Sequence, residues 1–267
     1  MTPAAGHLRA FTRRRSPLWF ELAVVVWLCW VYDAVSNLAH LRLGAALAHA
    51  REVAHLERVV HLDPERALDH WLSAHHALGW IVSTYYDNAH FVVTFGVLGW
   101  LWVRHPGHYR PLRSALALVN LAALGVFWLW PMAPPRMLPG YTDVVAATGA
   151  PGSWHSGALA THADELAAMP SLHLAWAVWS AWALWRVLRA RTRWAALAWL
   201  YPVSTAAAVL TTGNHFVADV AAGVALTGVV VPVADRMSAL HVRVLLHHHR
   251  RRHAHAGADA PELVEVP

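Results

Sequence analysis

The sequence predicts an all-α, polytopic membrane protein, in which six transmembrane helices form a bundle and an amphipathic helix lies at the membrane interface. Of its 267 residues, 57% are hydrophobic and only 14% are charged, which is unusual for a soluble domain. Apolar segments long enough to cross a bilayer, which takes about 20 residues, recur along the chain. We find no internal repeat and no separable soluble domain, so the chain is interpreted as one membrane bundle.

Each apolar segment of sufficient length is expected to form one span. These segments cover roughly 17–36, 77–103, 112–131, 172–189, 194–212 and 214–234. The first follows Arg13-Arg14-Arg15, as in a signal peptide, but its apolar run is too long and no cleavage site of small residues directly follows. It is therefore interpreted as a retained helix. Its Cys29 is the only cysteine, which excludes a disulfide within the chain.

The segment 37–76 is too polar to span a membrane. Between Leu41 and Val60 its apolar residues recur at near-helical spacing, with charged residues between them. This pattern predicts an amphipathic helix that lies at the interface or over the bundle. Asp63-Pro64 then marks a turn or the start of another helix.

The arginines indicate the topology. Those within 13–15, 104–113, 186–193 and 243–252 fall on one side if the segments cross in succession, and that side should be cytoplasmic. Both termini are then cytoplasmic, whereas the loop 132–171 and the turn 211–214 are extracytoplasmic. Because these arginines flank apolar segments and form no soluble patch, nucleic acid is not expected as a partner. Arginine without any lysine suggests a GC-rich bacterial genome, and hence a bacterial plasma membrane.

We expect three regions in the chain. Residues 1–16 form a basic cytoplasmic N-terminus, and residues 17–240 form the transmembrane domain with its site. Residues 241–267 form a tail rich in His and Arg, which we interpret as disordered and attracted to anionic headgroups. Metal binding by the histidines of this tail is the alternative.

Two histidines and a carboxylate are the main candidates for chemistry. His215 and Asp219 are four residues apart and share a helix face, so the carboxylate can hold one imidazole nitrogen protonated and leave the other with its lone pair. Asp219 lies in an apolar segment, where an ionisable group is costly and typically functional. The alternative is a charged residue near a helix end that reaches the headgroups. His173 begins the fourth span after Ser171, a favourable N-cap residue.

Both histidines lie at helix N-termini on the outer face, where free N–H groups and the helix dipole favour an anion. Arg136 follows Pro134-Pro135 in the outer loop and can bind a phosphate through two hydrogen bonds; the alternative is an arginine bound to headgroups. Together these residues predict phosphoryl transfer on a lipid. Weaker candidates share the loop or the second span: Asp143, His155, His162 and Asp164 are interpreted as loop polarity, and Tyr85, Tyr86, Asn88 and His90 either contact substrate or brace helices.

Three ordered motifs carry a family resemblance. Pro134-Pro135-Arg136, Pro170-Ser171-Leu172-His173 and Thr212-Gly213-Asn214-His215-Phe216-Val217-Ala218-Asp219 resemble those of the PAP2 (type 2 phosphatidic acid phosphatase) superfamily. More narrowly, they are similar to its branch related to inositol phosphorylceramide synthase and sphingomyelin synthase. The resemblance covers about residues 77–234 and, more loosely, 37–76.

The resemblance implies a role for each residue. His215 would be the nucleophile that forms a phosphohistidine, Asp219 would orient and activate it, and His173 would protonate the leaving oxygen. Arg136, Ser171 and Asn214 would bind the substrate. The implied mechanism needs neither a metal nor another cofactor.

The motifs also depart from the phosphatase pattern. Leu129 and Val209 stand where that pattern has a lysine and an arginine, and Leu172 replaces a glycine. These departures favour the transferase branch, so we expect a lipid phosphotransferase that moves inositol phosphate or another phospho-headgroup between lipids. The alternative is a phosphatase acting on a phospholipid or isoprenoid phosphate. A transporter is a distant alternative, because it would place ionisable residues at mid-depth and usually show repeated halves.

Overall fold

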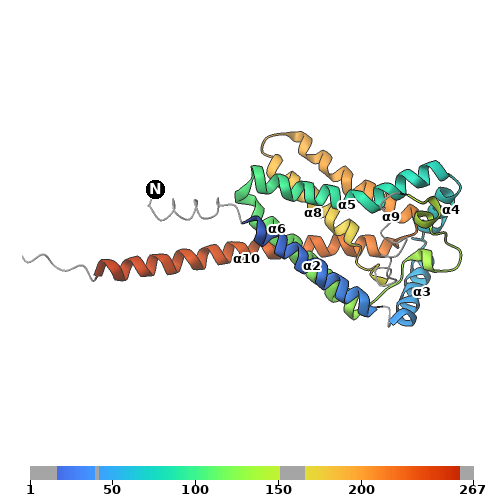
Figure 1. Cartoon of the computed structure of the whole chain (residues 1–267), viewed down its shortest axis with the longest axis horizontal. Coiled ribbons are helices and arrows are strands. Elements are labelled where there is room, and N and C mark those ends of the chain that lie inside the picture. Colours follow the sequence, from blue (N-terminus) through green and yellow to red (C-terminus); the bar gives the residue numbers. More distant parts are fainter. Residues whose placement is uncertain (1–16, 40–41, 151–165, 259–267) are drawn as a thin grey trace, which may run out of the picture.

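The computed structural model describes residues 17–39, 42–150 and 166–258, which form a bundle of helices (Figure 1). Within these ranges no strand forms, and extended pairing is limited to a bridge between Met132 and Ala167. The α-helices are α2 (Leu18–Ala39), α3 (Leu43–Val59), α4 (Glu65–Ser73), α5 (His76–Arg104), α6 (Pro106–Leu129), α7 (Val144–Thr148), α8 (Leu172–Leu188), α9 (Leu200–Thr211) and α10 (Val217–Ala258). Two 3₁₀ segments, η2 (Pro135–Met137) and η4 (Arg193–Trp199), complete the described elements.

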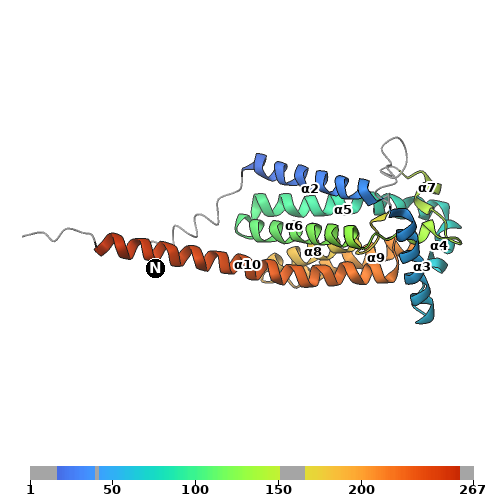
Figure 2. The same cartoon turned by 90° about the horizontal axis from the view of Figure 1, so that it is seen from below.

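The long helices lie side by side, and the short ones cover one end of them. Figure 2 shows α2, α5, α6, α8 and α10 running along the long axis of the molecule, whereas α3 lies across that axis at one end. Helices α4 and α7 lie at the same end, where α6 and α9 finish and α8 and α10 begin. We call this end of the molecule the site end.

Among the described residues, three helical segments are long and apolar enough to cross a membrane, which indicates a membrane protein. They are Pro106–Leu129 (α6), Arg193–Thr211 (η4 with α9) and Val217–Ser238 in α10. Helices α2, α5 and α8 occupy the positions of the other three expected spans. Of these, α5 carries many polar residues and α8 has only 17 residues. The six-span topology therefore stays a prediction.

Two regions differ in detail from the expectations. The segment 37–76 contains two helices, α3 and α4, and Pro64 directly precedes α4, as the Asp63-Pro64 signal predicts. At the other end of the chain, α10 continues to Ala258, although the last span was expected to finish near residue 234 and a disordered tail to start at 241. The residues after 234 include many Ala, Leu and Arg, which favour helix.

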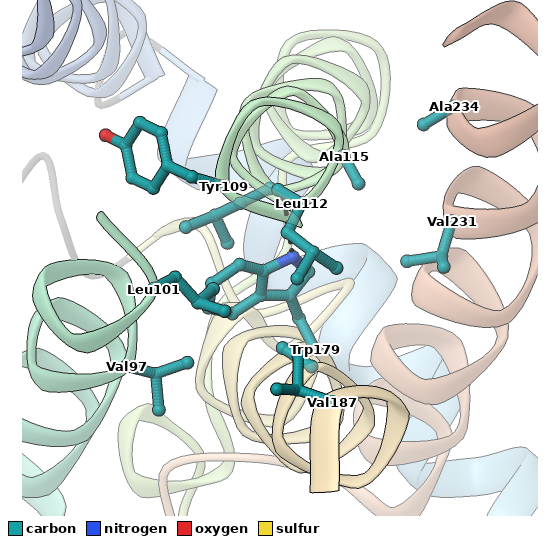
Figure 3. Packing of buried hydrophobic residues seen from close by; sticks show 11 residues of the cluster. Val97, Leu101, Tyr109, Leu112, Ala115, Trp179, Val187, Val231 and Ala234 are labelled. Atoms are coloured by element: carbon teal, nitrogen blue, oxygen red, sulfur yellow. Dashed lines mark hydrogen bonds between the residues drawn. The ribbon is translucent and has the colours of Figure 1, made fainter. Parts of the chain in front are cut away.

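The apolar core of the bundle surrounds Trp179 on α8 (Figure 3). The indole is fully buried, and its Nε1–H donates to the carbonyl oxygen of Leu112 on α6 at 3.0 Å. Val97 and Leu101 of α5 and Val231 of α10 belong to the same cluster. The core thus joins four helices, α5, α6, α8 and α10.

Polar pairs connect helices around this core. Arg186 of α8 donates through Nη1 to both carboxylate oxygens of Asp235 on α10, at 2.7 and 2.6 Å. On α2, Glu21 is buried and accepts a hydrogen bond from the Tyr109 hydroxyl of α6 at 2.8 Å. These contacts hold the helices that position the site at the other end.

Candidate active site

His215 and Asp219 meet at the start of α10. The distance from His215 Nδ1 to Asp219 Oδ2 is 3.4 Å, and both side chains are buried. The same Oδ2 accepts the backbone N–H of Phe216 at 2.9 Å, whereas Asp219 Oδ1 has no partner among the described residues. Asp219 is therefore fixed at the first turn of the helix, with its carboxylate directed at the imidazole.

A tight turn before α10 sets the direction of His215. Gly213 has φ +63°, the left-handed region that glycine adopts without strain. The turn is closed because the backbone N–H groups of Asn214 and His215 both donate to Val209 O, at 3.1 and 3.2 Å. The Asn214 side chain donates to Thr212 Oγ1 at 2.8 Å. This arrangement explains why Thr212-Gly213-Asn214 precedes the histidine.

His173 lies opposite His215. Its helix, α8, begins as predicted, with the Ser171 side chain as the N-cap that accepts from Leu174 N. The ring centroids of His173 and His215 are 5.7 Å apart at an interplanar angle of 63°. Tyr86 of α5 stacks on His173 at 4.4 Å, and His90 contacts it edge-on at 4.3 Å. The two motif histidines thus face each other beside an aromatic wall.

Backbone contact joins the two helices that carry the histidines. Ser171 N donates to Asp219 O at 3.1 Å. One turn further along α10, Gly223 lies so close to α8 that a Cβ atom there would be 2.4 Å from Ser171 O. The absence of a side chain at Gly223 therefore allows the helix starts to approach, and this residue was not singled out from the sequence.

Arg136 is held beside the turn by three contacts. Its backbone N–H donates to Gly213 O at 2.8 Å, and its Nη1 donates to Asn214 Oδ1. Its Nε lies 3.4 Å from Asp143 Oδ2, and its side chain is only 7% exposed. The guanidinium thus lies next to the segment that carries His215, with part of its charge balanced by Asp143.

Asp87 of α5 is a buried carboxyl group that sequence reasoning missed. It is 1% exposed, and neither oxygen has a hydrogen-bond partner among the described residues. It directly follows Tyr86 and lies close enough to Arg136 and Asp143 to interact electrostatically. A buried polar group without a partner is costly, so this position suits a group that accepts a hydrogen bond from a bound molecule.

Glu57 of α3 was also missed, and it supports the start of α10 from outside. Its Oε1 accepts the backbone N–H of Ala218 at 2.6 Å. The pKa of Glu57 is raised to about 8, mainly by burial and in part by the neighbouring Glu65 carboxyl. The pKa of Glu65 is raised as well, mainly by burial, and Tyr141 donates to it at 3.2 Å. The two carboxyl groups are close enough to share a proton.

The remaining sequence candidates fall into four groups. Tyr85 braces α9, since its hydroxyl contacts Ser204 Oγ at 2.7 Å, and Asn88 donates to Thr84 O at 2.9 Å. Tyr86 and His90, in contrast, lie against His173. Asp143, interpreted as ordinary loop polarity, pairs with Arg136. His155, His162 and Asp164 lie outside the described residues.

The two substrate-binding candidates besides Arg136 already have structural partners. The Ser171 hydroxyl caps α8, and the Asn214 amide contacts Arg136 and Thr212. Contact of either residue with a substrate stays a prediction.

The structure also places the two positions where the phosphatase pattern has a cation. Val209 is fully buried among apolar residues, and Leu129 is 75% exposed at the end of α6.

Taken chemically, the arrangement provides an imidazole beside a carboxylate, a second histidine opposite it, and a guanidinium nearby. Both histidines stand at helix N-termini, where N–H groups and the helix dipole favour an anion. Residues 51–233 match the sequence profile of the PAP2 superfamily, a range that contains all of these residues. No curated protein and no solved structure matches the chain significantly.

Proposed function

The chain belongs to the PAP2 superfamily, and we propose that it is a membrane lipid phosphotransferase that works through a phosphohistidine intermediate. Members of this superfamily are generally phosphatases or phosphotransferases that act on lipid-like substrates. One observation supports the proposal most strongly: His215, placed beside Asp219, faces His173 at a ring-centroid distance of 5.7 Å. A phosphoryl group bound against both rings would have a nucleophile and an acid within reach.

In the first step, the lone pair of His215 Nε2 attacks phosphorus while Nδ1–H points at Asp219. The N–P bond forms, and the bond from phosphorus to the leaving oxygen breaks with its electron pair on that oxygen. Protonated His173 gives a proton to this oxygen, so a neutral alcohol departs. The Asp219 carboxylate stabilises the positive charge that develops on the His215 ring.

In the second step, neutral His173 takes the proton from an incoming hydroxyl group, whose oxygen attacks phosphorus. The new P–O bond forms, and the N–P bond breaks with its electrons returning to His215. Arg136 would contact the phosphoryl oxygens in both steps, because a guanidinium matches phosphate geometry. Asp87 would accept a hydrogen bond from a hydroxyl group of the bound lipid or acceptor.

The choice between an alcohol and water as acceptor decides between transferase and phosphatase. At position 209, Val209 is packed against Tyr86 and Leu174, so an apolar contact replaces a cation of the phosphatase pattern. With fewer cations around the phosphate, we favour transfer of a phosphodiester headgroup, which carries less charge than a phosphate monoester. Inositol phosphate is one such group, and the alternative is hydrolysis of a lipid or isoprenoid phosphate.

The proposal includes six transmembrane spans, with the site on the extracytoplasmic side. The arginine clusters at 104–113 and 186–193 lie at the opposite end of the molecule from the site, which supports this orientation by the positive-inside rule. Helix α3 would then lie along the outer surface of a bacterial plasma membrane, as its direction across the bundle suggests (Figure 2).

The experiment compares membranes that contain the wild-type chain, His215→Ala or His76→Ala. The last variant is the matched control, because His76 is exposed at the start of α5. Each membrane receives labelled phosphatidylinositol or a labelled isoprenoid phosphate, with and without added lipid alcohols. Released phosphate and new phospholipid are measured together.

A new phospholipid formed by the wild type and the control, and absent from His215→Ala, supports the transferase. Free phosphate alone with the same dependence on His215 identifies the phosphatase. Equal product from the wild type and His215→Ala would overturn the catalytic proposal.

A further inference from the structure

A cavity of about 290 Å³ lies between α3, the start of α4 and the loop after η2. Helix α3 contributes Arg51, Ala54 and Arg58 to its wall. The turn into α4 and the loop contribute the rest, namely Asp63, Glu65, Arg66, Leu138, Pro139 and Tyr141. None of the residues that carry the proposed chemistry lines this cavity, so it is separate from the His215 site.

Three arginines make the cavity wall positively charged. In the described part of the chain, Arg51, Arg58 and Arg66 form no ion pair. Arg58 uses Nε for Ala54 O at 3.0 Å, which leaves its terminal nitrogens for other contacts. The Arg66 guanidinium packs over Gly140, where a Cβ atom would be 2.7 Å from Nη2. Because Gly140 has φ +89° and no side chain, the loop passes close to the arginine without displacing it.

The acidic residues of the cavity wall do not cancel this charge. Glu65 is fully buried and accepts the Tyr141 hydroxyl, and it can share a proton with Glu57. Asp63 provides the other carboxylate. The three arginines thus outnumber the two acidic residues of the cavity wall, so the cavity favours an anion.

We propose that this cavity binds a phosphate-bearing anion. Guanidinium groups match phosphate geometry through paired N–H donors. Three of them around one cavity provide more positive charge and more N–H donors than a single carboxylate ligand would use. The volume is at the lower end of small-ligand pockets, which run from about 300 to 1,000 Å³, so it suits a phosphate ester or a headgroup without its acyl chains. The source is either the headgroup of an anionic lipid or a soluble phosphate compound.

The cavity is connected to the site through its wall. Leu138 follows Arg136 by two residues, and Glu65 contacts Glu57, which holds Ala218 N at the start of α10. An anion in the cavity would therefore lie close to the residues that hold the start of α10, the helix that follows His215. This relation adds an accessory site to the proposed enzyme, but binding itself requires no turnover.

The test measures binding to the purified full-length chain in neutral detergent, by isothermal titration. The probes are a short-chain phosphatidylglycerol, a short-chain phosphatidylcholine, glycerol phosphate and inorganic phosphate. Arg51, Arg58 and Arg66 are changed together to Gln in the cavity variant. The matched control changes Arg104, Arg191 and Arg236 to Gln, which removes the same charge from exposed positions outside the cavity.

We expect a phosphate-bearing probe to bind the cavity variant at least about tenfold more weakly than the wild type and the control. If phosphatidylglycerol shows this loss and the soluble probes do not bind, the ligand is a lipid headgroup. If glycerol phosphate or inorganic phosphate shows the same loss, the ligand is a soluble phosphate compound. Equal affinity of wild type and cavity variant for every probe would overturn the proposal.

A single variant, Arg51→Gln, guards against misfolding of the triple variant, because Arg51 is exposed and makes no ion pair among the described residues. It should weaken the same probe severalfold at an unchanged melting temperature. Since these readouts need no catalysis, they succeed or fail independently of the proposed phosphotransfer.

Discussion

The Trp179 core and the site end of the molecule are stabilised in different ways. Around Trp179, apolar side chains of four helices pack together, and the buried indole N–H has its acceptor (Figure 3). At the site end, buried carboxyl groups each have at least one oxygen without a partner among the described residues; they are Glu57, Glu65, Asp69, Asp87 and Asp219. Away from the site end, Glu21 Oε1 and Arg113 Nε are also without a hydrogen-bond partner within the described ranges, but the unpartnered buried carboxyl groups are concentrated at the site end, whereas the Trp179 indole follows the rule that buried polar groups are paired.

This difference indicates that the site end lowers the stability of the fold in return for function. Buried polar groups without partners cost free energy, so they persist where binding or chemistry uses them. The core can supply that stability, because large buried side chains such as Trp179 contribute several kcal/mol each, about 3–5 by truncation to alanine. Variants in the two regions should therefore separate activity from stability.

The largest expected effect is on catalysis, in Asp219→Asn. The amide keeps the shape of the side chain but cannot stabilise a positive charge on His215, so the turnover rate should fall on the order of 10³-fold or more. Initial rates in detergent, together with the melting temperature, check this. A melting temperature within a few degrees of the wild type and an unchanged rate would contradict the orienting role.

A second prediction concerns the contact between α8 and α10. In Gly223→Ala the new Cβ would be 2.4 Å from Ser171 O, a backbone atom, so the helix starts must separate. We expect a loss of about 1–3 kcal/mol of stability together with reduced activity. Gly228→Ala is the control on the same helix, because nothing lies within 4 Å of its Cβ position. Thermal unfolding of the two variants should differ in this direction, and equal melting temperatures would show that the close approach is unimportant.

In the core, Trp179→Phe should lower stability without changing the chemistry. The substitution removes the hydrogen bond to Leu112 O and part of the buried ring, which costs about 1–3 kcal/mol. The turnover rate per folded molecule should equal that of the wild type, because Trp179 is not among the site residues. A rate loss as large as that of the site variants would remove the distinction between the two regions.

The smallest effect is a pH dependence of stability from Glu57. Because its pKa is raised from 4.5 to about 8 in the folded chain, its contribution is fully present below about 4.5 and is lost as the pH rises through about 8. The melting temperature should therefore decline across this window. Glu57→Gln, which stays neutral, should show a shallower decline, and identical slopes would contradict the raised pKa.

Much of the arrangement follows from local sequence signals. The helix that begins at Ser171, the turn at Gly213 and the pairing of His215 with Asp219 depend on neighbouring residues, so capping rules and helical spacing predict them. Asp63-Pro64, which marks a turn or a helix start, predicts part of the division of this region into α3 and α4.

The residues that were missed depend on contacts between distant segments. Glu57 contacts Ala218, and Gly223 contacts Ser171, across gaps in sequence that no periodicity encodes. Asp87 lies in a polar stretch of α5, where the carboxyl group directly after Tyr86 was the available signal. The length of α10, which continues to Ala258, follows from helix propensity and not from apolar composition, which ends with the span near residue 234.

The most direct test of the central claim is to trap the phosphohistidine. The purified chain is mixed briefly with a substrate labelled at phosphorus, quenched in alkali, and digested for mass spectrometry. We predict an acid-labile, alkali-stable phosphoryl group on His215 that is absent from His215→Ala and unchanged in His76→Ala. Turnover without any label on His215, or label that persists in His215→Ala, would contradict the account.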